Sequence, residues 1–64
     1  MRFLGIDYGK SKVGLAIAEE ETAIAFVHGI IPNDKNLFSK LLDLIEKEEI
    51  VKVIIGIPMY LKQS

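Results

Sequence analysis

The fold of the chain is decided by RFLGIDYGKSKVGLAIAEE, its residues 2–20. In Arg2–Tyr8, alternate side chains point to opposite sides, and both sets are largely apolar, which predicts a strand in the middle of a sheet. The polar turn at residues 9–12 is too short for a crossover connection. Residues 13–18, apolar throughout, are therefore predicted to return as an antiparallel second strand.

The sequence continues into a third strand. The acidic run at residues 19–21 predicts a solvated turn, because like charges in a block repel one another and stay hydrated. Residues 23–31 alternate again and predict a strand antiparallel to the second. Pro32 ends this strand, and Asn33 or Asp34 is predicted to cap a following helix. The first three strands thus form an antiparallel meander.

A change of period predicts one helix and then a last strand. The apolar residues that recur at helical spacing form one stripe, which consists of Leu37, Phe38, Leu41, Leu42 and Ile45. We expect the helix to end near Glu48, because acidic residues oppose the negative end of the helix dipole. Residues 51–57 are rich in β-branched side chains and predict a fourth strand, parallel to the first through a right-handed crossover. The predicted fold class is α/β, with strand order 3-2-1-4 and the helix over one face.

Size and composition limit what such a chain can be. It has 64 residues, half of them apolar, and a domain of this size buries only about 60% of the surface that its unfolded chain exposes. It has no cysteine, so neither disulfides nor a thiolate zinc site stabilises it. The predicted fourth strand is apolar on both faces but has no neighbour on its far side. We therefore expect residues 1–64 to be a single truncated half-domain that forms a homo-oligomer through this open edge.

The charge and hydropathy of the chain exclude two classes of protein. Eight basic and nine acidic residues give a net charge of −1, without the positive excess of a domain that binds nucleic acid over a broad surface. A basic footprint would be local, near the N-terminus. No apolar run approaches the roughly twenty residues that a bilayer requires, and the start of the chain does not have the pattern of a signal peptide. We expect a cytoplasmic protein that does not associate with a membrane.

Chemistry is indicated in one place, GIDYG at residues 5–9. Asp7 is predicted near the end of a buried central strand, where an ionised carboxylate is costly unless something compensates its charge. One hypothesis is that Asp7 is an oxygen ligand for Mg²⁺ or Mn²⁺, as at phosphodiester-cleaving sites. A second is that backbone amides of the Gly9 turn approach a nucleotide phosphate. A third is that Asp7 only caps the turn.

The residues around this turn have plain alternatives as well. Lys10 and Lys12 are candidates for binding the phosphates of a nucleic acid as point charges, and the alternative is that they are solvated turn lysines. Tyr8 could stack on a base, but a tyrosine in a central strand is interpreted as a core residue. His28 has no cysteine or histidine companion at the spacing of metal ligands and is interpreted as an ordinary strand residue.

At this point the sequence resembles a family. Its opening LGIDYG (residues 4–9), the basic Lys12, the continuation VGLA (residues 13–16) and the late VIIGIP (residues 53–58) are similar to the YqgF/RuvX-type Holliday-junction-resolvase-like nucleases. The resemblance covers essentially the whole chain. It implies an RNase H-like fold, with three antiparallel strands followed by parallel ones.

The same resemblance implies a function. It implies a nuclease that depends on Mg²⁺ or Mn²⁺ and that matures the 5′ end of pre-16S ribosomal RNA or acts on branched DNA. Asp7 corresponds to the family's first-strand catalytic aspartate, and residues 56–64 correspond to a loop beside the site. Family members are about twice as long, with further catalytic acids on a fifth strand and a last helix. The isolated chain is therefore expected to be inactive.

Two other functions stay open. The actin, sugar-kinase and chaperone ATPases also use Asp-x-Gly between their first two strands to bind phosphate, although serine or threonine normally follows that glycine where this chain has Lys10. The chain could instead be a non-catalytic module that associates with itself through its open edge. Nucleotide binding would favour the first of these alternatives, and a stable monomer at micromolar concentration would contradict the second.

Overall fold

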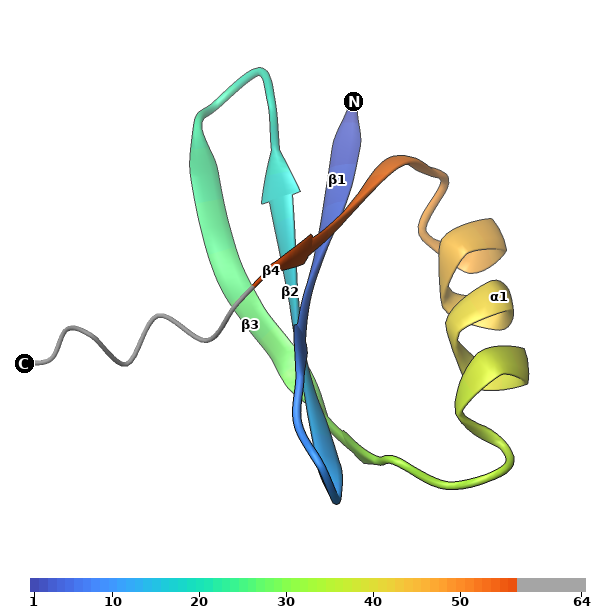
Figure 1. Ribbon diagram of the computed structural model, residues 1–64. Coiled ribbons are helices and arrows are strands. Elements are labelled where there is room, and N and C mark those ends of the chain that lie inside the picture. Colours follow the sequence, from blue (N-terminus) through green and yellow to red (C-terminus); the bar gives the residue numbers. More distant parts are fainter. Residues whose placement is uncertain (57–64) are drawn as a thin grey trace, which may run out of the picture.

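The strand order of the sheet follows from its connections. The computed structural model describes residues 1–56, which form a four-stranded sheet and one helix (Figure 1). The strands lie in the order β3-β2-β1-β4, with β1 antiparallel to β2, β2 antiparallel to β3, and β1 parallel to β4. The elements are β1 (Arg2–Tyr8), β2 (Lys12–Glu19), β3 (Ile24–Pro32), α1 (Leu37–Lys47) and β4 (Ile50–Gly56). The predicted α/β fold, meander and strand order 3-2-1-4 are confirmed.

The core lies between α1 and one face of the sheet (Figure 1). Its buried members are Leu4, Ile6, Val13, Leu15, Ile17 and Leu37. The five strand residues among them alternate along β1 and β2, so one face of these strands supplies nearly the whole core. In a strand of this kind, truncating a fully buried leucine such as Leu4 removes about 2–5 kcal/mol of stability.

The prediction that β1 and β4 are buried on both faces is wrong for residues 1–56. Ile54 and Ile55, which point to opposite sides of β4, are 49% and 72% exposed. Phe3 and Gly5, on the uncovered face of β1, are half-buried. A single helix covers only one face of the sheet, which leaves Ile54 uncovered, and Ile55 on the covered face is exposed because β4 is an edge strand of the described sheet. We call the other face, which carries Phe3, Gly5 and Asp7, the open face.

The helix differs from its prediction in two details. Its cap position is Asn36, whose side chain makes no capping hydrogen bond, so neither Asn33 nor Asp34 caps it. Asp34 instead accepts a hydrogen bond from the backbone N–H of Asn36 at 2.9 Å and shapes the turn before the helix. Phe38 and Leu42 belong to the predicted apolar stripe but are exposed, because the stripe is wider than the strip of helix that the sheet covers. The helix of residues 37–47 is too short to span a membrane.

Candidate functional site

Asp7 stands between two glycines on the open face. In the register of the sheet, Asp7 of β1 pairs with Gly14 of β2 on one side and with Gly56 of β4 on the other. A Cβ added to Gly14 would lie 3.5 Å from the Cβ of Asp7 and 4.0 Å from its Oδ2. A Cβ added to Gly56 would have no atom within 4 Å. The two neighbouring strands therefore leave the carboxylate clear of side chains on either side.

The prediction that Asp7 is a buried carboxylate is wrong. Asp7 is exposed, and residues 1–56 contain no buried charged group. The open face has no helix over it within this part of the chain, so the carboxylate stays in water and needs no compensating partner. No side chain of the described residues donates a hydrogen bond to it or forms an ion pair with it. An exposed and unpaired carboxylate at a strand end is available to a cation.

The turn after Asp7 requires a glycine. The backbone N–H of Gly9 donates to the carbonyl oxygen of Lys12 at 2.9 Å, which closes the turn between β1 and β2. A Cβ added at Gly9 would lie 2.4 Å from that same carbonyl oxygen, closer than any real contact. The glycine at this position is therefore set by the close approach of the backbone in the turn.

Asn33, the residue directly after β3, donates hydrogen bonds to this turn. Its side-chain amide donates to the carbonyl oxygens of Gly9 at 2.8 Å and Lys10 at 3.2 Å, and its backbone N–H donates to the carbonyl oxygen of Ser11 at 2.9 Å. The hydroxyl of Tyr8 donates to Oδ1 of Asn33 at 3.4 Å. This contact corrects the prediction for Tyr8, which is 54% exposed and lies over the turn rather than in the core.

The two predicted nucleic-acid-binding lysines lie at the same end of the sheet as Asp7. Lys10 is in the turn and Lys12 is the first residue of β2, and both are exposed. Neither forms an ion pair within residues 1–56. A pocket of about 310 Å³ beside Lys12 is lined by Ser11, Lys12, Ile30, Ile31 and Pro32. The structure thus brings Asp7, Lys10 and Lys12 together around one turn, while His28 stands exposed on β3, away from it.

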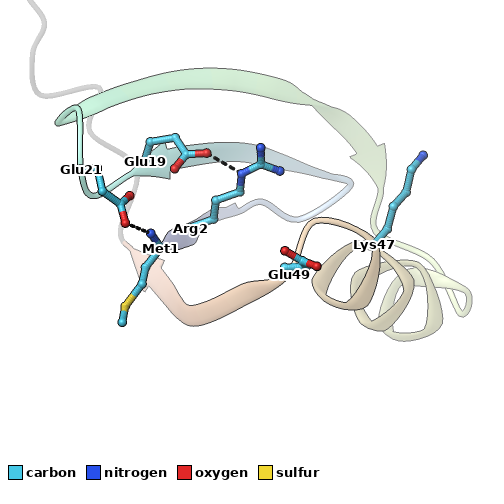
Figure 2. A pocket seen from close by; sticks show the side chains of 6 residues that line it. All are labelled: Met1, Arg2, Glu19, Glu21, Lys47 and Glu49. Atoms are coloured by element: carbon cyan, nitrogen blue, oxygen red, sulfur yellow. Dashed lines mark hydrogen bonds and ion pairs between the residues drawn. The ribbon is translucent and has the colours of Figure 1, made fainter.

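The opposite end of the sheet carries a larger pocket in which several of the charged groups pair with one another (Figure 2). It has a volume of about 410 Å³. The amino group of Met1 pairs with Glu21, and Arg2 pairs with Glu19 at 2.5 Å and with Glu48 at 2.7 Å. The hydrogen bond that Arg2 donates to the Glu19 carboxylate raises the pKa of the Arg2 guanidinium. Since the charges of Met1, Arg2, Glu19 and Glu21 are used in ion pairs, we assign this pocket a structural role and not a chemical one.

The described residues do not make a complete metal site. Within residues 1–56, no three histidine, cysteine, aspartate or glutamate side chains lie close enough together to hold an ion. Asp7 is therefore a single ligand candidate. Residues 57–64, predicted to form a loop beside the site, lie outside the described residues.

Sequence reasoning missed Asn33 and the pair Gly14 and Gly56. Asn33 was interpreted as a helix cap because it follows Pro32, and its contacts with the first turn depend on the β2–β3 register. The two glycines become neighbours of Asp7 only when three strands are aligned. A signal was present for Gly14, because it interrupts an apolar strand at the position directly opposite Asp7 in a short hairpin.

Comparisons with known proteins agree with one another. A family model described as "RuvX: Holliday junction resolvase" matches residues 1–64. A protein of Maridesulfovibrio salexigens is 36% identical over 63 residues, which are 95% of this chain and 47% of that protein. A protein of a Sulfurihydrogenibium species is 38% identical over 61 residues, which are 95% of this chain and 42% of that protein. A protein of Rickettsia africae is 40% identical over 58 residues, which are 88% of this chain and 38% of that protein. All three are named "Putative pre-16S rRNA nuclease", and the chain spans less than half of their length.

Proposed function

The chain belongs to the RuvX family of Holliday junction resolvases, as its first and fourth strands predicted, and from this premise we propose that it is part of a cytoplasmic, metal-dependent nuclease. The proposed substrate is structured RNA, such as the 5′ end of a pre-16S rRNA precursor, or branched DNA. The observation that carries the proposal is Asp7, an exposed carboxylate between two glycines at a strand end of a chain matched over its whole length.

The proposed cofactor is Mg²⁺ or Mn²⁺, with Asp7 as one of its ligands. Ions of this class are often held by one or two carboxylates together with water and substrate phosphates, so a single exposed aspartate fits as a partial ligand set. The bound ion would supply Lewis-acid polarisation of a phosphoryl oxygen. Because residues 1–56 offer only this one carboxylate to the site, we expect further acids to come from outside them and the isolated chain to be inactive.

The chain's own residues would bind and orient the substrate. Lys10 and Lys12 carry positive charge at the turn next to Asp7 and would attract the backbone phosphates. Gly14 and Gly56 leave room beside the carboxylate for a phosphate to approach. These four residues and Asp7 lie on three adjacent strands or the turn between them, about 5 Å apart from strand to strand.

We further propose that the chain forms a homo-oligomer through the free edge of β4. In the described part of the chain β4 pairs with β1 on one side only, and its residues Val53, Ile54 and Ile55 are exposed. An exposed apolar edge strand is a template for pairing with another chain. Analytical ultracentrifugation at micromolar concentration is expected to show a dimer or larger species, and a stable monomer would contradict this part of the proposal.

Metal binding by Asp7 is tested without relying on catalysis. Mn²⁺ broadens the NMR signals of nearby amides, so titration of the ¹⁵N-labelled chain is expected to broaden Asp7 and Gly14 first. Asp7→Asn is expected to abolish this selective broadening. Asp43→Asn, which removes an exposed carboxylate on α1, is the matched control and is expected to change nothing. Unchanged broadening near residue 7 in Asp7→Asn would remove Asp7 from the metal site.

Cleavage by the full-length protein separates the two substrate classes. One substrate is an RNA that carries the 5′ leader of 16S rRNA, and the other is a four-way DNA junction. Cleavage of either is expected to require Mg²⁺ or Mn²⁺ and to fall below detection in Asp7→Asn. If the wild-type protein cleaves neither substrate under any metal condition, the proposed function is wrong.

A further inference from the structure

One residue binds three successive carbonyl groups of the β1–β2 turn. The carbonyl oxygens of Gly9, Lys10 and Ser11 all accept hydrogen bonds from Asn33, the first two from its side chain and the third from its backbone N–H. A surface turn of this length would normally present its carbonyls to water. Here they face a single donor residue, so the orientation of the peptide groups in the turn is fixed.

The orientation of these carbonyls also orients the amides of the turn. In a planar trans peptide the N–H points opposite to the C=O, and the chain has no cis peptide bond in its described part. The carbonyls of Gly9 and Lys10 point at Asn33, so the N–H groups of Lys10 and Ser11 point away from it. Within residues 1–56 neither N–H has a protein acceptor. Two successive amides are thus directed to solvent on one side of the turn.

Asn33 and Asp7 lie on opposite faces of the sheet at this turn. Asn33 also contacts the hydroxyl of Tyr8, so its side chain lies on the face of the sheet to which Tyr8 points. Successive residues of a strand point to opposite faces, which puts Asp7 on the other face. The side chains of Asn33 and Asp7 therefore lie on opposite faces, and the amides that point away from Asn33 belong to the turn that borders the open face, to which Lys12, by its register, also projects.

We propose that the β1–β2 turn is a phosphate-binding loop for the nucleic acid substrate, with Asn33 as the positioning residue that holds it open. The N–H groups of Lys10 and Ser11 would donate to phosphate oxygens, and the ammonium groups of Lys10 and Lys12 would add charge. Successive backbone amides on one side of a turn form a concavity that binds anions. The phosphate bound there neighbours the one at Asp7. This inference rests on the proposed function and adds to it the group that places the substrate.

The direct test is a titration of the ¹⁵N-labelled chain with a short single-stranded RNA. The amide signals of Lys10 and Ser11 are expected to shift most, and downfield, as N–H groups that gain a charged acceptor do. This readout needs no variant, so it stands even if a substitution at the turn unfolds the chain. Shifts confined to other parts of the molecule would overturn the inference.

A matched pair of asparagine variants tests the role of Asn33. Asn33→Ala removes the two side-chain donors, and RNA binding is expected to weaken about tenfold because the turn amides lose their orientation. Asn36→Ala removes an asparagine side chain that makes no capping hydrogen bond, and it is expected to bind RNA as the wild type does. Circular dichroism verifies that both variants are folded. If folded Asn33→Ala binds RNA with wild-type affinity and the same amide shifts, Asn33 is not a positioning residue and the inference is wrong.

Two further probes distinguish the source of the phosphate. Inorganic phosphate and ATP offer the same oxygen chemistry as a nucleic acid backbone. If RNA binds at least tenfold more tightly than inorganic phosphate or ATP, at equal phosphate concentration, the result supports a site for nucleic acid. If ATP shifts the amide signals of Lys10 and Ser11 and RNA does not, both this inference and the nuclease proposal are overturned. If RNA binds elsewhere and is still cleaved by the full-length protein, the inference fails and the proposed function stands.

Discussion

The two ends of the sheet differ in how their charges are used. At the end where β1 begins, Arg2 and the amino group of Met1 are paired with the carboxylates of Glu19, Glu21 and Glu48. At the end where β1 stops, the described residues leave Asp7, Lys10 and Lys12 without ion-pair partners. Both ends are exposed, and both carry acids and bases within one or two strands of each other.

The pairing of these charges indicates which end of the sheet is available to a ligand. The ion pairs at the first end join Met1 and β1 to β2, to the β2–β3 turn and to the C-terminal end of α1, so their effect is structural. At the second end the chain uses uncharged contacts for the structural work, through Gly9 and Asn33, and keeps its charged groups in solvent. Substitutions of the charged side chains at the two ends are expected to separate stability from binding.

The largest effect is expected from Gly9→Ala, which breaks the turn at the ligand end. A Cβ at residue 9 would lie 2.4 Å from the carbonyl oxygen of Lys12, so the backbone must move. The expected loss of stability is about 1–3 kcal/mol, with loss of RNA binding. Gly5→Ala is the matched control, because its Cβ would lie 3.8 Å from the carbonyl oxygen of Ala16 and fits. Urea denaturation and RNA titration of both variants check the prediction, and equal stability for the two would contradict it.

Gly14→Val is expected to affect function and leave stability intact. A β-branched residue is favoured in a strand, but its methyl groups would fill the open face next to the carboxylate of Asp7. Mn²⁺ binding is expected to weaken by about tenfold, the lower range for disturbed surroundings of a metal ligand. Ala16→Val, two residues along the same strand and on the same face, is the control. Equal Mn²⁺ affinities of the two variants would show that Gly14 does not keep the site clear.

The fold could be predicted from the sequence because its signals are local. The alternation in Arg2–Tyr8, the short turn after it and the change to helical period at Leu37 each depend on a few neighbouring residues. These signals gave the element order and the strand order 3-2-1-4. Burial was predicted less well, because a pattern that is apolar on both faces does not say how many layers cover it.

The candidate site could be predicted only in part. Asp7 and the two lysines are close in sequence and were found from one motif. The side-chain amide of Asn33 contacts Gly9 and Lys10, which are 24 and 23 positions away, and these contacts depend on β3 ending beside the first turn. Its proline neighbour and its place before a helix favoured a local interpretation as a cap. Long-range side-chain contacts of this kind leave no periodic trace in a sequence.

Substitution of one basic residue at each end of the sheet compares the effects on stability and on RNA binding. Arg2→Ala removes two ion pairs and is expected to lower the Tm by less than Gly9→Ala does, because both partners remain partly in solvent. It is expected to leave RNA binding unchanged. Lys10→Ala is expected to leave the Tm unchanged and to reduce the salt dependence of RNA binding, the slope of log K against log salt, by about 0.7. Thermal melts and binding isotherms at several salt concentrations check both variants. A lower Tm in Lys10→Ala, together with a reduced salt dependence of RNA binding in Arg2→Ala, would contradict the comparison.

The smallest effect is expected from pH at the paired end. The hydrogen bond with the amino group of Met1 lowers the pKa of Glu21 from its ordinary 4.5, and the same bond raises the pKa of the amine from its ordinary 8.0. The carboxylate's contribution to stability is complete above 4.5 and is lost as pH falls through its lowered pKa. The amine's contribution is complete below 8.0 and is lost as pH rises through its raised pKa.

The pair therefore stabilises the fold most between pH 4.5 and 8.0. The difference in Tm between the wild type and Glu21→Gln is expected to be small, to be largest inside this window and to vanish toward both extremes. Glu20→Gln removes the neighbouring exposed acid, which forms no ion pair in residues 1–56 and makes the smallest contribution to the raised pKa of the amine, and is the control that should show a much weaker window. A Tm difference for Glu21→Gln that does not change with pH would mean that the Met1–Glu21 contact does not stabilise the fold, and the paired end would then rest on Arg2 alone.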